Sequence, residues 1–413
     1  MVLDSLEIFI HDLLIKRPAL RHFIYGFYQR LIYTILPKIK SEGNITSITP
    51  NDGKEYFFGY YDKSPWDIKD RYLLCLKVDD TTKSVAPKQS ADIILIDTLN
   101  GSFNKIADTR TWNVQQGCML QWLGPDYSRR IIYNDFRAGK YCSIILDLKN
   151  KTEKIIQKPV YSVSSNGKFA LSLDFSRLHR LRPGYGYANL EDNTKNELCP
   201  DKVCIWKIFL DNGKIEPLLK YTDFLSFEPR AEMIGAVHKV NHIMLNPSGN
   251  RFMVLHRWYK DAIKYTRLIT CNSEGKNMYN LSDEDFVSHC NWRNDEEIIS
   301  YLNKKDGGKG YYLLKDKTKQ YSRLWPELVV DGHPSYSPDG RYVVTDSYPN
   351  RQRLQTVYVM NHDNVKEVSR VFSPFKYSGD YRCDLHPRWS RGGDKICIDA
   401  TFEGRRGIYY IEV

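Results

Sequence analysis

Four histidines occupy the same position in four successive sequence units. Each stands three residues before a Leu, Trp or Tyr and seven before a Gly or Glu, and the matching positions of two earlier units hold Lys63 and Val160. The chain has 10 histidines in 413 residues, so four at one register exceed what scattering would give. These residues are His242, His289, His333 and His386.

Imidazoles that converge on one point would make a divalent-metal site. Each neutral ring offers one lone pair, whereas buried rings without a metal would compete as cations in one cavity. The alternative is that each histidine only bonds the turn of its own unit. His238 and His256 extend the group around His242. Cys199 and Cys204 lack a second thiol pair at suitable spacing, so we do not expect zinc there.

Further polar residues stand at the matching end of other units. The segment that opens the first unit contains Tyr60, Tyr61 and Lys63, and Arg382 precedes His386. Arginine can bind a carboxylate with two parallel hydrogen bonds. Arg230 and Arg257 flank the fourth unit. We predict that Arg382, Lys63, Arg257 and Tyr61 bind substrate.

The elements that position these residues follow from a repeat. After Ile45, a polar turn followed by a β-branched or aromatic strand occurs seven times, about 50 residues apart. The turns begin at Asp70, Ser128, Asn166, Gly249, Asp295, Asp339 and Gly393. One four-stranded sheet cannot bury both faces alone, whereas a ring of sheets covers every face. The sequence therefore predicts an all-β, seven-bladed β-propeller over residues 44–413, in which equivalent histidines face the central channel.

The third interval is the longest and predicts an insertion at residues 175–236. It contains a basic stretch with Gly and Tyr, at residues 177–187, that is typical of an extended loop at a blade end. Such a loop either contributes to function or forms a solvated face.

Residues 1–43 predict an amphipathic helical arm. Apolar residues recur every three or four positions, and Pro18 divides the segment into two helices. Six basic residues and interleaved tyrosines are typical of a helix that lies in a membrane interface. The alternative is that the arm packs on the body of the protein or on a second subunit.

Composition limits the function classes. A chain with 42% hydrophobic residues is not disordered, and 13% aromatic residues with 25 Gly and 18 Pro favour a β-rich fold. The net charge of +10 comes from scattered residues, which favours an anionic ligand over nucleic acid. Nine cysteines, several in apolar runs, indicate free thiols. With no apparent secretory signal, we expect a cytoplasmic protein, with the arm able to attach it to the inner face of the membrane.

Two kinds of motif resemble known families. Ser335-Tyr336-Ser337-Pro338-Asp339-Gly340 and Pro387-Arg388-Trp389-Ser390 resemble the TolB-type propeller repeat. The order of motifs from His242 through Leu255-His256-Arg257-Trp258 and Ser288-His289 to Asp331-Gly332-His333 is similar to that of oligogalacturonate-lyase-like seven-bladed propellers.

The second resemblance implies β-elimination of an acidic, uronate-containing oligosaccharide or polysaccharide with a divalent metal, manganese or zinc. It implies that His289 and His333 are ligands, that His242 is a ligand or the base, and that Arg230 binds the carboxylate. His238 and Tyr60 are further catalytic candidates. The family's additional ligands, a Gln and a second His, correspond here to Val330 and Ser335. We expect His386 to substitute for them.

Two other functions fit the same residues. The first is a non-catalytic propeller that binds a glycan or a partner protein in bacterial surface-polysaccharide assembly, since similar TolB-like chains accompany that process. The second is a glycoside hydrolase, which needs two carboxylates about 5 to 9.5 Å apart. Asp62, Asp331 and Asp384 are the candidates for that pair.

Overall fold

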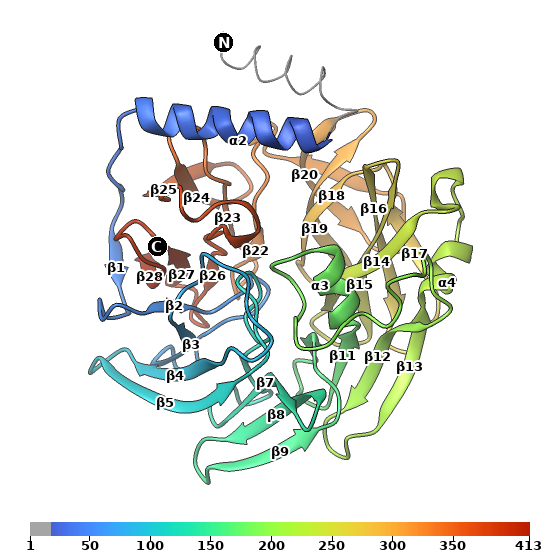
Figure 1. Cartoon of the computed structure of the whole chain (residues 1–413), viewed down its shortest axis with the longest axis horizontal. Helices are drawn as coiled ribbons and strands as arrows, with labels where there is room; N and C mark the ends of the chain where they lie inside the picture. The colour runs from blue at the N-terminus through green and yellow to red at the C-terminus, as the bar shows by residue number, and fades with distance from the viewer. Residues whose placement is uncertain (1–17) are drawn as a thin grey trace.

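The protein is a seven-bladed β-propeller. The structure is a computed structural model that describes residues 18–413. In this part of the chain, seven four-stranded antiparallel sheets form a ring (Figure 1). The predicted fold class is therefore confirmed.

The blades follow one another in chain order. The first three contain β2 (Glu55–Phe57), β3 (Tyr72–Val78), β4 (Ala91–Asp97) and β5 (Ser102–Thr109); β6 (Gln121–Trp122), β7 (Arg130–Arg137), β8 (Lys140–Asp147) and β9 (Thr152–Ile156); and β10 (Ser162–Val163), β11 (Phe169–Leu173), β12 (Val203–Phe209) and β13 (Ile215–Lys220). The next three contain β14 (Val237–Leu245), β15 (Arg251–Lys260), β16 (Ile263–Asn272) and β17 (Tyr279–Ser282); β18 (Val287–Trp292), β19 (Glu297–Lys304), β20 (Gly308–Lys315) and β21 (Tyr321–Leu324); and β22 (Ser335–Tyr336), β23 (Val343–Asp346), β24 (Leu354–Met360) and β25 (Val365–Phe372).

The seventh blade closes the ring with both ends of the described chain. It combines β26 (Arg388–Trp389), β27 (Lys395–Ala400) and β28 (Gly407–Glu412) with β1 (Ile45–Ser47), which pairs with the outer side of β28. Ile45 lies opposite Ile411 in this register. The first and last strands thus protect each other's backbone hydrogen-bonding groups from solvent.

The seven repeated turns all precede the second strand of a blade. In the sixth blade, Tyr342 N donates to Ser337 Oγ over 3.0 Å, and Ser337 N donates to Tyr342 O over 2.9 Å. Gly340 has a φ of 72° in this turn, a conformation that glycine adopts without steric cost. The polar residues of the repeat therefore close the turn, and the apolar residues after it enter the core between adjacent sheets.

Tryptophans of the repeat join one blade to the next. Three of them, each at the position three residues after the histidine register, donate an indole hydrogen bond to the inner strand segment of the preceding blade. These bonds run from Trp122 to Pro65 O (2.9 Å), from Trp292 to Met244 O (3.0 Å) and from Trp389 to Ser335 O (3.1 Å). The tryptophan thus sets how the inner strands meet around the channel.

The predicted insertion is two segments rather than one loop. Helix α3 (Phe175–Leu181) and the chain after it lie between β11 and β12, whereas α4 (Tyr221–Ser226) and the 3-10 helix η1 (Ala231–Met233) lie between β13 and β14. The strands β12 and β13 separate them because their apolar residues complete the third blade. A further 3-10 helix, η2 (Gly379–Tyr381), precedes β26.

The arm forms a helix that lies along the outside of the ring (Figure 1). Helix α2 (Pro18–Ile35) begins at the proline where the sequence predicted a break. The first predicted helix lies outside the described residues. The Tyr33 ring packs against Phe372 and Phe375, with centroids 6.4 and 5.5 Å away. Within residues 18–413, no helix has the length and apolar character needed to cross a bilayer.

Candidate functional site

The four histidines of the repeat converge. Ring centroids are 5.4 Å apart for His242 and His289, 4.1 Å for His289 and His333, and 4.4 Å for His333 and His386. All four residues are buried, with at most 6% of their surface exposed. Adjacent blades therefore aim their imidazoles at a common region, as the register predicted.

Irregular backbone turns these rings inward. The pairing of β14 with β15 shifts between Asn241 and Met244, so that His242 lies in a β-bulge, and the pairing of β18 with β19 shifts around His289. A bulge redirects a side chain that a regular strand would place elsewhere. His242 and His386 also have φ values of 57° and 45°, in the left-handed region that non-glycine residues rarely occupy.

Two tyrosines from the first blade fill the space beside the histidines. Tyr60 Oη is 2.5 Å from His242 Nε2, and the Tyr60 ring lies 5.0 Å from that of His386. Tyr61 Oη donates to Cys290 O over 2.8 Å, and its ring lies 5.3 Å from that of His333. The predicted catalytic candidate Tyr60 and the predicted substrate ligand Tyr61 thus both reach the cluster.

A buried arginine holds the segment that carries these tyrosines. Arg388 donates to Gly59 O over 2.7 Å and to Tyr60 O over 3.1 Å. Asp399 accepts hydrogen bonds from Arg388 and from Arg406, with distances of 3.1 and 3.2 Å. This network fixes the backbone beside the site because the buried Arg388 guanidinium is held by two carbonyl oxygens and the Asp399 carboxylate.

Asp346 orients two of the histidines. Its Oδ1 is 2.8 Å from His333 Nδ1 and accepts the His333 backbone N–H over 2.8 Å, while Oδ2 accepts the His386 backbone N–H over 3.1 Å. The contact directs a ring proton to Nδ1, which leaves Nε2 of His333 for another partner. Sequence reasoning missed Asp346. Asp346 and Asp399 each stand six residues after the repeat glycine in otherwise apolar strands, which is a signal that could have indicated them.

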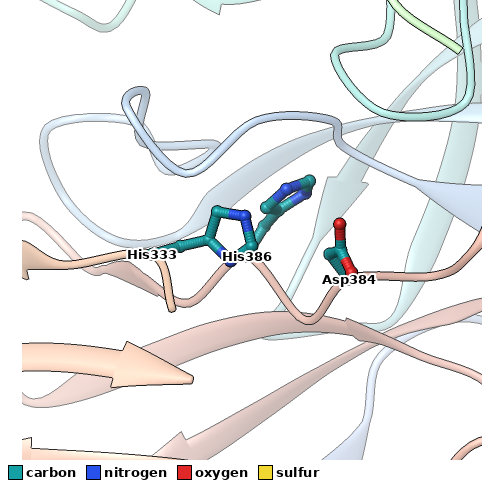
Figure 2. Close-up of side chains that lie close together, drawn as sticks. All are labelled: His333, Asp384 and His386. Carbon is teal, nitrogen blue, oxygen red and sulfur yellow. The ribbon is translucent and has the colours of Figure 1, made fainter. Parts of the chain in front are cut away.

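Two of these four histidines present buried nitrogens that have no hydrogen-bond partner within residues 18–413. These atoms are Nε2 of His333 and both Nδ1 and Nε2 of His386. Asp384 adds a carboxylate, and each of these three residues offers a ligand atom within 4.8 Å of the others. Figure 2 shows the two imidazoles and the carboxylate gathered at one point. Among residues 18–413, this is the group of three that could hold a metal ion.

Charges around the cluster favour neutral imidazoles. Burial, followed by the neighbouring His289 and Arg257, holds the pKa of His242 well below its usual range. Burial and His333 do the same for the pKa of His386 and lower that of His289 to about 4. Metal binding requires neutral imidazole, so these rings need not lose a proton at neutral pH.

His333 and Asp384 differ from the other members of the cluster. Burial alone would lower the pKa of His333, but the Asp346 carboxylate outweighs it and raises the pKa. Burial alone would raise the pKa of Asp384, yet Arg382 holds it below its usual range. Arg382 Nε and a terminal nitrogen both donate to the Asp384 carboxylate. The carboxylate therefore stays ionised, as a metal ligand must be.

The donor set fits a divalent ion. Three buried nitrogens without partners and an ionised carboxylate are the ligand types that such ions take, and unpaired buried polar atoms are otherwise costly. His289 directs Nδ1 toward Ser288 Oγ at 3.0 Å and Asp331 Oδ1 at 3.4 Å, and His242 directs Nε2 toward Tyr60. Of the four predicted ligands, His333 and His386 are thus the ones with fully buried nitrogens that no hydrogen bond satisfies within residues 18–413.

A group of cations lies beside the histidines without an acidic partner. Arg257 and Lys239 are 8% and 1% exposed, and they are joined by Arg182 from the first inserted segment. Within the described chain, no carboxylate lies at ion-pair distance from any of the three. Arg257 Nε has no partner, and Lys239 Nζ donates only to Leu181 O, at 3.3 Å. Burial, then Arg257 and Arg182, hold the pKa of Lys239 well below its usual range. An anion placed here would relieve this repulsion.

Other predicted residues lie elsewhere. His238 Nδ1 is 2.9 Å from His256 Nε2, and His256 Nδ1 accepts from Arg267 over 3.1 Å, in a separate cluster. Arg230 forms ion pairs with Glu232, Asp283 and Asp285, because three acidic groups surround it. Neither placement supports a catalytic role.

Lys63 is paired with the neighbouring Asp62 over 2.7 Å. The pair lines a pocket of about 260 Å³ together with Ser335, Trp389 and Arg391, and none of the four histidines contributes to the lining. Arg382 is closer to the cluster, since it binds Asp384 and its guanidinium lies 4.4 Å from the centroid of Tyr348. Tyr348 also packs 5.8 Å from His333.

The carboxylates considered for glycoside hydrolysis are all engaged. Asp62 binds Lys63, Asp331 accepts from Ser288 Oγ over 2.6 Å, and Asp384 binds Arg382. A general acid in such an enzyme needs a raised pKa, whereas the pKa of Asp384 is lowered. The geometry therefore favours a role for Asp384 as a ligand.

Comparisons with known proteins agree with this architecture. No family model matches the chain. Residues covering 34% of the chain are 24% identical to the Tol-Pal system protein TolB of Francisella tularensis subsp. mediasiatica, and the TolB of subsp. tularensis strain FSC 198 is 25% identical over 32% of the chain. The match spans about a third of the length of these relatives.

Solved structures extend the likeness to nearly the whole chain. An oligogalacturonate lyase from Vibrio parahaemolyticus has a TM-score of 0.63 at 13% identity and covers 91% of this chain and 97% of its own. A manganese complex of oligogalacturonate lyase has a TM-score of 0.66 at 16% identity, with the same coverage. The chain is a seven-bladed propeller whose fold is similar to that of oligogalacturonate lyase, and the predicted resemblance to a TolB-like or lyase-like propeller is confirmed for the fold.

Proposed function

We propose that this protein is a divalent-metal-dependent enzyme that cleaves an acidic, uronate-containing oligosaccharide or polysaccharide by β-elimination. The observation that carries the proposal is the pairing of two features in one site. A cluster of four histidines, three of which burial keeps neutral, and an ionised carboxylate adjoin buried cations that have no acidic partner in the described chain. This combination suits a substrate that carries a carboxylate next to the bond to be broken.

The reaction defines what the residues must do. The proton at C5 of a uronate is very weakly acidic, so the site must neutralise the adjacent carboxylate, accept the proton and protonate the departing oxygen. A divalent ion held by His333, His386 and Asp384 would supply Lewis acidity toward that carboxylate. Arg257 and Lys239 would bind the negative charge of the substrate.

His242 and Tyr60 are the pair to which we assign proton transfer. The bond of 2.5 Å joins an imidazole whose pKa is lowered to a phenol whose pKa is raised by burial. The proton therefore remains on the phenol oxygen in the resting site, and His242 accepts hydrogen bonding from it. With substrate in place of this hydrogen bond, His242 Nε2 would take the C5 proton and Tyr60 would give its proton to the departing oxygen. The imidazolium would then return a proton to the phenolate, which restores the resting pair.

The test combines metal content with product formation. We would measure the bound metal of the purified full chain by elemental analysis and screen uronate oligosaccharides, with manganese or zinc added, for the absorbance of an unsaturated product. His333→Ala should abolish product formation. His362→Ala is the matched control, because His362 is an exposed histidine that is paired with Asp363 and does not stand at the histidine position of the repeat. Product from the His333 variant at the wild-type rate would contradict the proposal.

A non-catalytic propeller that binds a glycan or a partner protein in surface-polysaccharide assembly is the second candidate. It is favoured by the closure of the site, because Tyr60, Tyr61 and Tyr185 are each at most 6% exposed and cover the histidines. The Tyr185 ring packs 6.1 Å from Tyr60. Stabilisation by an acidic glycan without any product would favour this second function.

A further inference from the structure

Helix α2 carries a line of apolar side chains that the propeller does not cover. Phe27, Leu31 and Ile35 are 65%, 47% and 67% exposed. Their spacing of four residues places them along one side of the helix, over about 12 Å. On the opposite side of the helix, Tyr33 packs against Phe372 and Phe375 of the propeller.

This line differs from the other exposed apolar residues of the described chain. From residue 36 onward, no two large apolar residues that are exposed lie on the same helix or strand. Single exposed apolar side chains are normal on soluble proteins, whereas a continuous line marks an interaction surface.

The charge around the line identifies the partner. The part of the arm that the structure describes, residues 18–41, contains four basic residues and no Asp or Glu: Arg21, Arg30, Lys38 and Lys40. Two copies meeting through this face would bring like charges together, because a two-fold contact sets the same surface against itself. An anionic partner would neutralise them.

We propose that α2 binds the surface of an anionic lipid membrane, with Phe27, Leu31 and Ile35 inserted at the boundary between headgroups and acyl chains. A helix with an apolar side, flanking cations and no acidic residue is the type that lies in the plane of such an interface. The cations add attraction to anionic headgroups, which salt screens. Figure 1 shows the helix along the outside of the ring.

The experiment is sedimentation of the full chain with lipid vesicles. We expect binding to vesicles of phosphatidylglycerol and phosphatidylcholine, at least tenfold weaker binding to phosphatidylcholine alone, and a decrease with added salt. Leu31→Glu should lower binding to the anionic vesicles at least tenfold. Leu99→Glu is the matched control, because Leu99 is 77% exposed on the turn between β4 and β5, and it should bind as the wild type does.

Thermal unfolding followed by circular dichroism would show whether both variants fold. If the Leu31→Glu variant does not fold, the double variant Phe27→Gln with Ile35→Gln is the second test. Failure of the wild type to bind anionic vesicles would overturn the proposal. So would equal losses in the Leu31 and Leu99 variants, or a dimer in solution that Leu31→Glu dissociates. None of these outcomes depends on metal binding or on product formation, so the proposed function is tested separately.

Discussion

Two buried histidine clusters in the same propeller differ in how their nitrogens are used. In the pair His238 and His256, all four ring nitrogens have partners: His238 with His256 and Met233 O, and His256 with His238 and Arg267. In the channel cluster, His386 has two unpaired nitrogens and His333 has one. Satisfied histidines act as structural hydrogen-bonding groups, whereas unsatisfied ones are prepared for a ligand. Burial alone does not distinguish the two.

The largest expected effect is on metal affinity. His333→Ala, His386→Ala and His289→Ala should each weaken manganese or zinc binding by at least about 100-fold, equivalent to about 3 kcal/mol, because each removes an imidazole from the channel cluster. Titration calorimetry of the purified variants measures this. Full metal occupancy in any of these variants would contradict the assignment for that residue, and unchanged affinity in all three would remove the contrast between the clusters.

The second effect is on folding and concerns the other cluster. His256→Ala should lower the free energy of unfolding by about 3 kcal/mol, since it leaves the buried Arg267 without one of its acceptors and opens a cavity. Denaturant unfolding measures the loss, and metal affinity should stay as in the wild type. A His256 variant that unfolds normally but loses metal would reverse the roles of the two clusters.

Acid should destabilise both clusters. Burial, then Arg267, holds the pKa of His256 well below its usual range, and the pKa values of His242 and His386 are lowered in the same way. For His289 the window lies between the ordinary value of 6.5 and about 4. The unfolded chain binds protons first as the pH falls below 6.5, so each such histidine lowers the free energy of unfolding by up to about 1.4 kcal/mol per pH unit.

His333 acts with the opposite sign, because its raised pKa lets the folded protein bind the proton first. Its contribution is present at acidic pH and is lost as the pH rises through the folded value. Denaturant unfolding between pH 5 and 8 measures the sum, which should fall toward acid. A stability that is flat across this range would show that the buried rings titrate as they do in water.

The smallest effect concerns the cations without partners. Lys239→Met should raise the free energy of unfolding by about 1 kcal/mol, since it removes a buried group that Arg257 and Arg182 repel. The same variant should lose any stabilisation by acidic oligosaccharides. Lys366→Met on β25, a lysine on an exposed part of a strand, is the control. A destabilised Lys239 variant would show that this lysine is structural.

The fold was predictable because the turn chemistry repeats. Gly340 and its equivalents need the same backbone conformation in several blades, and tryptophans three residues after the register position join three pairs of neighbouring blades. Convergence of the histidines followed from that register. The length of the insertion did not show that β12 and β13 divide it. These two strands are recognised only in the structure, where they form the outer pair of the third blade.

The details of the site depend on contacts between distant segments. Lys239 and Arg182 meet the histidines only in the folded ring, so spacing along the chain does not indicate them. Arg230 has the right charge for a carboxylate ligand, but three local acidic residues already bind it. The sequence identifies which residue types occupy a register. Which of these side chains find a partner, and which stay unpaired, depends on how the chain packs.

The pairing of β1 with β28 determines when, during synthesis of the chain, the ring can close. Tyr60 belongs to the first blade and His386 to the last, and the last blade is complete only when residues near the carboxyl end reach the strand at Ile45–Ser47. A chain still emerging from the ribosome therefore lacks the complete cluster. The inner surface of the ring, with all four histidines beside Tyr60, can form only after nearly all of residues 18–413 have been translated.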